Sequence, residues 1–338
     1  MQHEITAEGP LFDGIGNLIE PGWSRQMLLK YNRDAVKKSA WSIKEWDYYI
    51  ISDGRYGVAL TVADNGYMGL LSASVLDFIR PWEKTNTVME AFVLGRYHMP
   101  ASSNSGDVEV SAKGCAIRFE NLGTQRRLSC TYERFYENST LDVDITLSAP
   151  EKESIVIATP FHKPRHFYYN QKINCMPASG FVRLGELEFA FSGENSFGTL
   201  DWGRGVWTYD NTWYWGSGNG MVNGKPFGFN IGYGFGDTRA ATENAILYDH
   251  KLHKLEHVAF QIPTESYLKP WTFSSSDGRF EMAFTPILDR AARTNAVIIE
   301  TDQHQVFGRF SGRAVLDDGT VLQIKDLLGF AEKVRNRY

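Results

Sequence analysis

The sequence has 338 residues, of which 43% are hydrophobic and 22% charged, so the chain can bury a sizeable core and disorder is excluded. The formal net charge of −5 provides no basic field of the kind that nucleic acid partners require. No stretch approaches the roughly 18 apolar residues of a membrane span, and residues 1–17 lack the features of a targeting signal, which predicts a soluble, cytoplasmic protein without an integral membrane segment.

Strand-length segments rich in β-branched and aromatic residues dominate the first half of the chain. They cover residues 46–52, 57–62, 69–76, 116–120, 141–147 and 155–158. The sequence also contains 14% aromatic residues and 31 glycines, a combination typical of strands joined by tight turns around bulky rings. We therefore predict an all-β, mainly antiparallel fold.

A segment with two prolines, residues 159–170, interrupts the rhythm of strands. We place a boundary near Arg165, which predicts an N-terminal half of residues 1–165 and a C-terminal half of residues 166–338. In the second half, residues 182–191 alternate between apolar and polar across a turn at Gly185. Three dipeptides, Asn223-Gly224, Asp277-Gly278 and Asp318-Gly319, predict further antiparallel hairpins.

Helical spacing is convincing only at the end of the chain. The apolar residues there recur at roughly helical intervals, namely Ile324, Leu327, Leu328, Phe330, Ala331 and Val334. The sequence therefore predicts one C-terminal helix, from about Asp326 to Arg335, that caps a barrel.

Four of the nine tryptophans lie between residues 201 and 220. Because a strand alternates faces, Trp213 and Trp215 should share one face, while Asp201 and Arg204 could pair only if a bulge intervenes. Such a pair would either close a corner of the barrel or belong to a site. Both interpretations stay open here, because a buried ion pair need not be functional.

Several motifs resemble those of the DUF2804 family, in the same order along the chain. They are residues 22–25, 174–177, 201–207, 213–218, 242–245, 290–295, 304–312 and 326–332. The resemblance implies a fold of two lipocalin-like β-barrel halves, similar to the AttH and carotenoid 1,2-hydratase group and more distantly to tocopherol cyclase. It does not imply an activity.

The chemistry of the related hydratase and cyclase groups provides a first hypothesis: an enzyme that acts on an apolar or isoprenoid-like small molecule by acid catalysis (hydration, isomerisation or cyclisation), as a hydratase or cyclase-like lyase or isomerase. A carboxylic acid would protonate an alkene, and an aromatic pocket would stabilise the resulting cation. The catalytic candidates are Asp201, Glu243 and His304. The candidates for substrate binding are Trp202, Arg204, Trp207, Asp210, Trp213, Trp215, Asn244 and Arg309. No cofactor is expected.

Two alternative functions remain at this stage. The chain could bind a lipophilic ligand without transforming it, as many lipocalin barrels do. More weakly, the mixture of aromatic and carboxylate residues could form a carbohydrate-processing cleft with paired carboxylates. Sequence leaves the oligomeric state open.

A metal site is not expected either. His253 and His257 match a metalloprotease string, but on a strand they would lie roughly 13 Å apart, too far to share one ion. The charged candidates Asp201, Arg204, Glu243 and Arg309 are expected to converge at the mouth of the second barrel, beneath Trp207, Trp213 and Trp215. Burial would otherwise leave these charges without partners.

Overall fold

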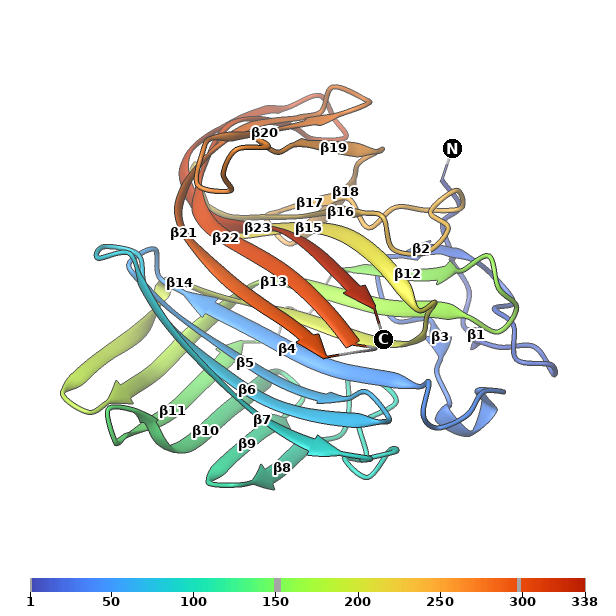
Figure 1. Ribbon diagram of the computed structural model, residues 1–338. Helices are drawn as coiled ribbons and strands as arrows, with labels where there is room; N and C mark the ends of the chain where they lie inside the picture. Colours follow the sequence, from blue (N-terminus) through green and yellow to red (C-terminus); the bar gives the residue numbers. More distant parts are fainter. Residues whose placement is uncertain (1, 149–152, 297–298, 338) are drawn as a thin grey trace.

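The computed structural model describes residues 2–148, 153–296 and 299–337. Strands make up most of these residues, and the one helical element among them is a single 3-10 turn, η1 (Arg33–Ala35). Two large antiparallel sheets, both strongly curled, form the molecule (Figure 1). The all-β, mainly antiparallel prediction is confirmed. No helix within the described ranges is long and apolar enough to cross a membrane.

The first sheet has twelve strands, in the order β7-β6-β5-β4-β14-β13-β11-β10-β9-β8, with β12 between β13 and β2. Its strands are β2 (Gly22–Ser24), β4 (Lys44–Ser52), β5 (Tyr56–Asp64), β6 (Met68–Asp77), β7 (Trp82–Ala91), β8 (Val108–Ala112), β9 (Cys115–Asn121), β10 (Gln125–Tyr136), β11 (Ser139–Ser148), β12 (Ile155–Pro160), β13 (Phe167–Leu184) and β14 (Leu187–Val206). A short parallel pair, β1 (Gly9–Pro10) and β3 (Leu29–Lys30), lies outside it.

The second sheet has nine strands, in the order β18-β17-β16-β15-β23-β22-β21-β20-β19. Its strands are β15 (Asp210–Val222), β16 (Lys225–Tyr233), β17 (Ala245–Tyr248), β18 (Lys251–Lys254), β19 (Val258–Gln261), β20 (Trp271–Ser275), β21 (Phe280–Ala296), β22 (Ile299–Val315) and β23 (Val321–Arg337). Figure 1 shows these strands arching over the first sheet, with β21 to β23 crossing above β4.

The chain passes from one sheet to the other between Val206 and Asp210. The predicted boundary at residues 165 and 166 falls instead at the turn between β12 and β13, and both of these strands belong to the first sheet. The pairing explains the difference, because β13 pairs with β12 and β14 pairs with β4. The prolines thus mark a turn within the first sheet, not the change of sheet.

The predicted C-terminal helix is wrong, because residues 321–337 form strand β23 between β15 and β22. A register shift occurs beside Asp326, whose φ of 52° is left-handed. Before the shift only alternate residues are buried, whereas residues 327–332 are buried on both faces. The bulge shifts the alternation, and the doubly buried stretch then has the apolar spacing of a helix.

The predicted hairpins are confirmed. Asn223 and Gly224 join β15 to β16, and both have positive φ, as a type I′ turn requires. The other turns, at Gly185, at Asp277-Gly278 and at Asp318-Gly319, also lie between paired antiparallel strands. Local turn chemistry therefore predicted these parts of the topology.

Each sheet encloses its own apolar core, and two further clusters lie between the sheets. One of them packs Tyr48 and Phe78 of the first sheet against Trp215, Phe307 and Phe330 of the second. The three cysteines are free and buried, as expected of thiols used as small apolar side chains. The sheets therefore share a continuous interface, and the candidate site lies within it.

Candidate active site

A cavity of about 370 Å³ lies between the two sheets. This volume falls within the range of small-molecule sites. Seven aromatic side chains from three strands and two connecting segments line it: Trp46, Tyr48, Tyr168, Trp207, Trp213, Trp215 and Phe235. Alternation places them there, since Trp46 and Tyr48 project from one face of β4, and Trp213 and Trp215 from one face of β15.

The rings contact one another edge to face around Phe235. Its centroid lies 4.8 Å from that of Tyr168 and 5.3 Å from those of Trp207 and Trp213. Trp46 stacks on Tyr168 at 5.8 Å. A side chain at Gly203 would place its Cβ only 2.1 Å from the ring of Trp46, so glycine is what allows that ring to lie over β14.

Lys172 of β13 is the central cation of the cavity. Its Nζ lies 2.9 Å from Asp201 Oδ1, 3.9 Å from Glu243 Oε2 and 3.8 Å from the ring centroid of Trp215. Asn170 also donates to Asp201 Oδ1, at 2.6 Å. The ammonium therefore holds the two carboxylates together and covers one aromatic face.

Glu243 reaches the cavity from the loop before β17. The amide of Asn230 donates to its Oε2 at 3.0 Å and accepts from the indole of Trp215 at 2.7 Å. Burial raises the pKa of Glu243, and the charge of Lys172 opposes that change. Gly232 leaves room for this carboxyl, because a Cβ there would lie 2.5 Å from Glu243 Oε1.

Glu332 of β23 is the third buried carboxyl. Its Oε1 accepts from the indole of Trp213 at 3.0 Å, and its Oε2 accepts from the amide of Gln305 at 2.9 Å. The residue is 5% exposed, and burial raises the pKa of its carboxyl to about 7 against the weaker, opposing effects of its neighbours. This carboxyl can therefore hold or release a proton near neutral pH.

Sequence reasoning missed Glu332 and Lys172. Glu332 lies in a motif that resembles the family, but the stretch was assigned to a helix and its carboxyl was not considered as part of a cavity. Lys172 carried the alternation signal of a strand, since it lies two residues from Asn170 and four from Tyr168. Its partners, however, come from segments far away in the sequence.

Of the predicted site residues, the structure brings Asp201, Glu243, Trp207, Trp213 and Trp215 to this cavity. The other six lie elsewhere: Trp202, Arg204, Asp210, Asn244, His304 and Arg309. Asn244 follows Glu243 in the sequence, but its side chain is buried and bonds the backbone. It accepts from Gly232 N at 2.6 Å and donates to Glu256 O at 2.9 Å.

Trp202 and Arg204 project from the opposite face of β14, into the first sheet. The register of β14 runs without a shift from Leu200 to Val206, so no bulge turns Arg204 toward Asp201. Arg204 is fully buried and donates to Asp47 Oδ1 at 3.0 Å. Arg309 lies elsewhere again, donating to the carbonyl of Gly54 at 2.6 Å. The expected convergence of both arginines with Asp201 and Glu243 is therefore wrong.

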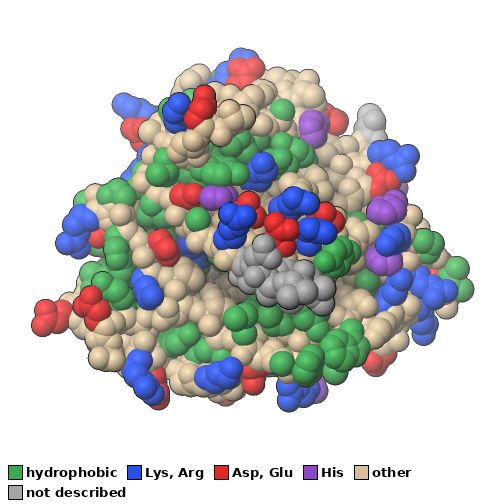
Figure 2. All heavy atoms as spheres, in the orientation of Figure 1, with side chains coloured by type: hydrophobic (Ala, Val, Ile, Leu, Met, Phe, Trp, Pro, Cys, Tyr) green, Lys and Arg blue, Asp and Glu red, His purple; other side chains and the backbone are tan. Residues whose placement is uncertain are grey.

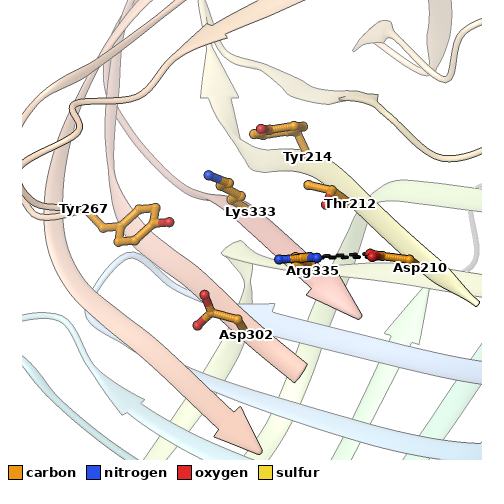
Figure 3. Close-up of a pocket in the computed structure, with 7 residues that line it drawn as sticks. All are labelled: Asp210, Thr212, Tyr214, Tyr267, Asp302, Lys333 and Arg335. Carbon is orange, nitrogen blue, oxygen red and sulfur yellow. Dashed lines mark hydrogen bonds and ion pairs between the residues drawn. The ribbon is translucent and has the colours of Figure 1, made fainter. Parts of the chain in front are cut away.

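Asp210 and His304 belong to the other face of the second sheet. A polar groove of about 570 Å³ opens there, lined by Asp210, Thr212, Tyr214, Tyr267, Asp302, Lys333 and Arg335 (Figure 3). Asp210 pairs with Arg335 at 3.1 Å, and His304 stacks on Tyr267 at 3.9 Å. Figure 2 shows acidic and basic side chains gathered where β22 begins and β23 ends.

The aromatic cavity places three carboxyl groups beside apolar walls, an arrangement suited to proton transfer. Across the described part of the chain, no group of three or more His, Cys, Asp or Glu side chains could hold a metal ion. Asp201 and Glu243 instead share the ammonium of Lys172, and Glu332 accepts hydrogen bonds from two neutral groups, Trp213 and Gln305. The cavity thus combines one carboxyl that can remain protonated with two carboxyls that share one ammonium.

Solved structures that share this fold include a hydratase and a candidate AttH protein. Kievitone hydratase from Nectria haematococca superposes with a TM-score of 0.54 at 12% identity, over 98% of each chain. A candidate AttH protein from Nitrosomonas europaea superposes with a TM-score of 0.52 at 12% identity, over 90% of this chain and 96% of that one. No curated protein matches the sequence.

The family is established by sequence rather than by these distant structures. The model of the domain of unknown function DUF2804 matches residues 2–338. The match spans the strands of both sheets, including every cavity residue named above. The chain therefore belongs to the DUF2804 family.

Proposed function

We propose that the protein is an enzyme that adds water across a carbon–carbon double bond of a largely apolar small molecule. The observation that carries this proposal is the Glu332 carboxyl, which lies buried in an aromatic cavity with its pKa raised to about 7. A general acid works best when its pKa is close to the working pH. A hydratase among the proteins that share the fold supports the same reaction class.

The hydrogen bonds of Glu332 suit a proton donor. Trp213 and Gln305 both donate to the carboxyl. Glu332 is the acceptor in both bonds, so the proton of the neutral acid remains available to a ligand in the cavity. Transfer of this proton to one alkene carbon leaves positive charge on the other carbon, and the faces of nearby rings such as Trp213 stabilise a cation.

The position of the cation follows from Lys172. Its ammonium already covers Trp215, so a second positive charge is disfavoured there. We therefore assign the alkene to the side of Trp213 and Phe235. Asp201 or Glu243 then orients the attacking water and takes its proton, so that hydrogen and hydroxyl are added and no redox partner is needed. Loss of that proton to solvent and uptake of one by Glu332 restore the enzyme.

Binding of a lipophilic ligand without catalysis is the second candidate. It is favoured by the pairing of Lys172 with Asp201 and Glu243, since a paired cluster also suits a purely architectural role. A glycosidase fits less well, because Lys172 lies between these two carboxylates, where the sugar would have to bind.

The experiment is hydration of a panel of isoprenoid and prenylated aromatic alkenes in water enriched in oxygen-18, followed by mass spectrometry. The proposal predicts a product heavier than its substrate by one molecule of labelled water. Glu332→Gln should abolish the product, whereas Glu281→Gln, an exposed residue paired with Arg313, should leave the rate unchanged. Tight binding of several panel members without any labelled product would favour the non-catalytic candidate.

A further inference from the structure

Arg290 of β21 lines the aromatic cavity but takes no part in the proposed proton transfer. Its Nη1 donates to Ser74 Oγ at 2.7 Å, and its guanidinium carbon lies 5.9 Å from the ring centroid of Tyr48. A guanidinium has five N–H donors. Its guanidinium also hydrogen-bonds the Tyr48 hydroxyl, but no carboxylate among the described residues pairs with it, so its remaining donors are available to a ligand.

The wall beside Arg290 is polar. Thr61, Ser72, Thr85 and Thr87 line the cavity from β5, β6 and β7. Thr85 Oγ1 lies 2.8 Å from Ser74 Oγ, and Ser72 Oγ lies 2.9 Å from Thr87 Oγ1. These hydroxyls extend the polar surface that Arg290 begins.

The order of strands separates this polar wall from the aromatic wall. In the first sheet, β7, β6 and β5 occupy one edge, whereas β4, β14 and β13 follow toward the centre. The hydroxyl side chains come from the first three strands, and Trp46, Tyr168 and Asp201 come from the next three. The cavity therefore concentrates hydroxyl groups along one side and aromatic rings along the other.

We infer that the ligand of this cavity is amphipathic, with an anionic oxygen group bound by Arg290 and an apolar portion against the tryptophans. The inference rests on the proposed function for the location of the site and adds the chemical class of the substrate. A carboxylate, phenolate or sulfonate would use the unsatisfied N–H groups, since guanidinium forms strong, directional bonds with anionic oxygens.

The nearest acidic groups leave this role open to a ligand. Glu83 also lines the cavity, but its Oε2 meets the Thr85 hydroxyl at 2.8 Å instead of the guanidinium. Glu332 is affected by the charge of Arg290, yet accepts from Trp213 and Gln305. Tyr48, beneath the guanidinium, has its pKa raised by burial and is neutral.

Two fluorescent probes with the same rings test the inference. 8-Anilino-1-naphthalenesulfonate carries a sulfonate, and N-phenyl-1-naphthylamine lacks it. Dissociation constants are measured for both, and mutual displacement shows whether they share one site. Arg290→Gln should weaken binding of the sulfonate by at least about tenfold, as expected for loss of a charge-assisted hydrogen bond, and change binding of the neutral probe less than twofold.

Arg293→Gln is the matched control. It removes the same charge from the same strand at an exposed position paired in register with Asp302, and should leave both constants unchanged. Arg290→Lys should recover part of the lost affinity for the sulfonate. Equal constants for the sulfonate in wild type and Arg290→Gln, or an equal loss for both probes, would overturn the inference while leaving the proposed function in place. Failure of both probes to bind the wild type would count against the inference and against the proposed function.

Discussion

Glu332→Gln should stabilise the folded protein at alkaline pH while it removes the proposed acid. The wild-type side chain is 5% exposed, and burial raises its pKa from 4.5 to about 7. Gln has nearly the same shape and can still accept from the indole of Trp213, while Gln305 can rotate its amide so that its oxygen accepts from the new NH2 group. The substitution therefore removes little except the ability to ionise.

The magnitude follows from proton linkage. Between pH 4.5 and 7 the folded protein keeps a proton on Glu332 that the unfolded chain has lost, so the free energy of unfolding of the wild type falls as the pH rises. Each pH unit in this window lowers the free energy of unfolding by about 1.4 kcal/mol, so the total loss above pH 7 is about 3 kcal/mol. Below pH 4.5 both states hold the proton, and the penalty disappears.

The assay compares the thermal midpoints of wild type and Glu332→Gln at pH 5 and pH 8.5. We expect the variant to unfold roughly 3–6 °C higher than the wild type at pH 8.5, and to differ much less at pH 5. Glu281→Gln, at an exposed position, controls for the loss of a carboxylate. An equal difference at the two pH values, or a lower midpoint of the variant at pH 8.5, would refute the reasoning.

Four further outcomes are expected. The rate of hydration should fall as the pH rises through about 7, because Glu332 must be protonated to act, and a rate that rises in this range would contradict the assignment. Lys172→Met should lower stability by about 3–5 kcal/mol in a denaturant titration, since it leaves two buried carboxylates without their cation. Arg204→Leu should cost about as much by stranding Asp47, yet leave the dissociation constant of N-phenyl-1-naphthylamine unchanged in the folded fraction. Deletion of β23 should prevent soluble expression, because that strand joins β15 to β22, whereas a terminal cap could be removed with milder effect.

Local sequence signals predicted the class of fold well. Turns such as Asn223-Gly224 require a left-handed backbone, which few residues tolerate, so the hairpins could be identified without knowledge of their surroundings. Alternation also placed Trp213 and Trp215 on one face, and both line the cavity. These features depend on neighbours in sequence and need no tertiary information.

Contacts between segments far apart in the sequence account for what local signals failed to predict. Packing between the two sheets buries residues 327–332 on both faces, next to the bulge beside Asp326. The resulting spacing of apolar residues resembles that of a helix. With the segment assigned to a helix, Glu332 could not be recognised as a cavity residue. Nearness in sequence suggested that Arg204 pairs with Asp201, but these two residues project from opposite faces of β14. The partner of Arg204 is Asp47, which lies 157 residues away on another strand.

The aromatic cavity between the sheets, with Glu332 at its wall, is the proposed ligand site. The most direct test is a crystal structure of the protein with N-phenyl-1-naphthylamine. The account predicts that the rings lie between Trp213 and Phe235, within contact of the Glu332 carboxyl. Density for the probe only in the polar groove beside Lys333, with the cavity between the sheets closed to it, would contradict the claim.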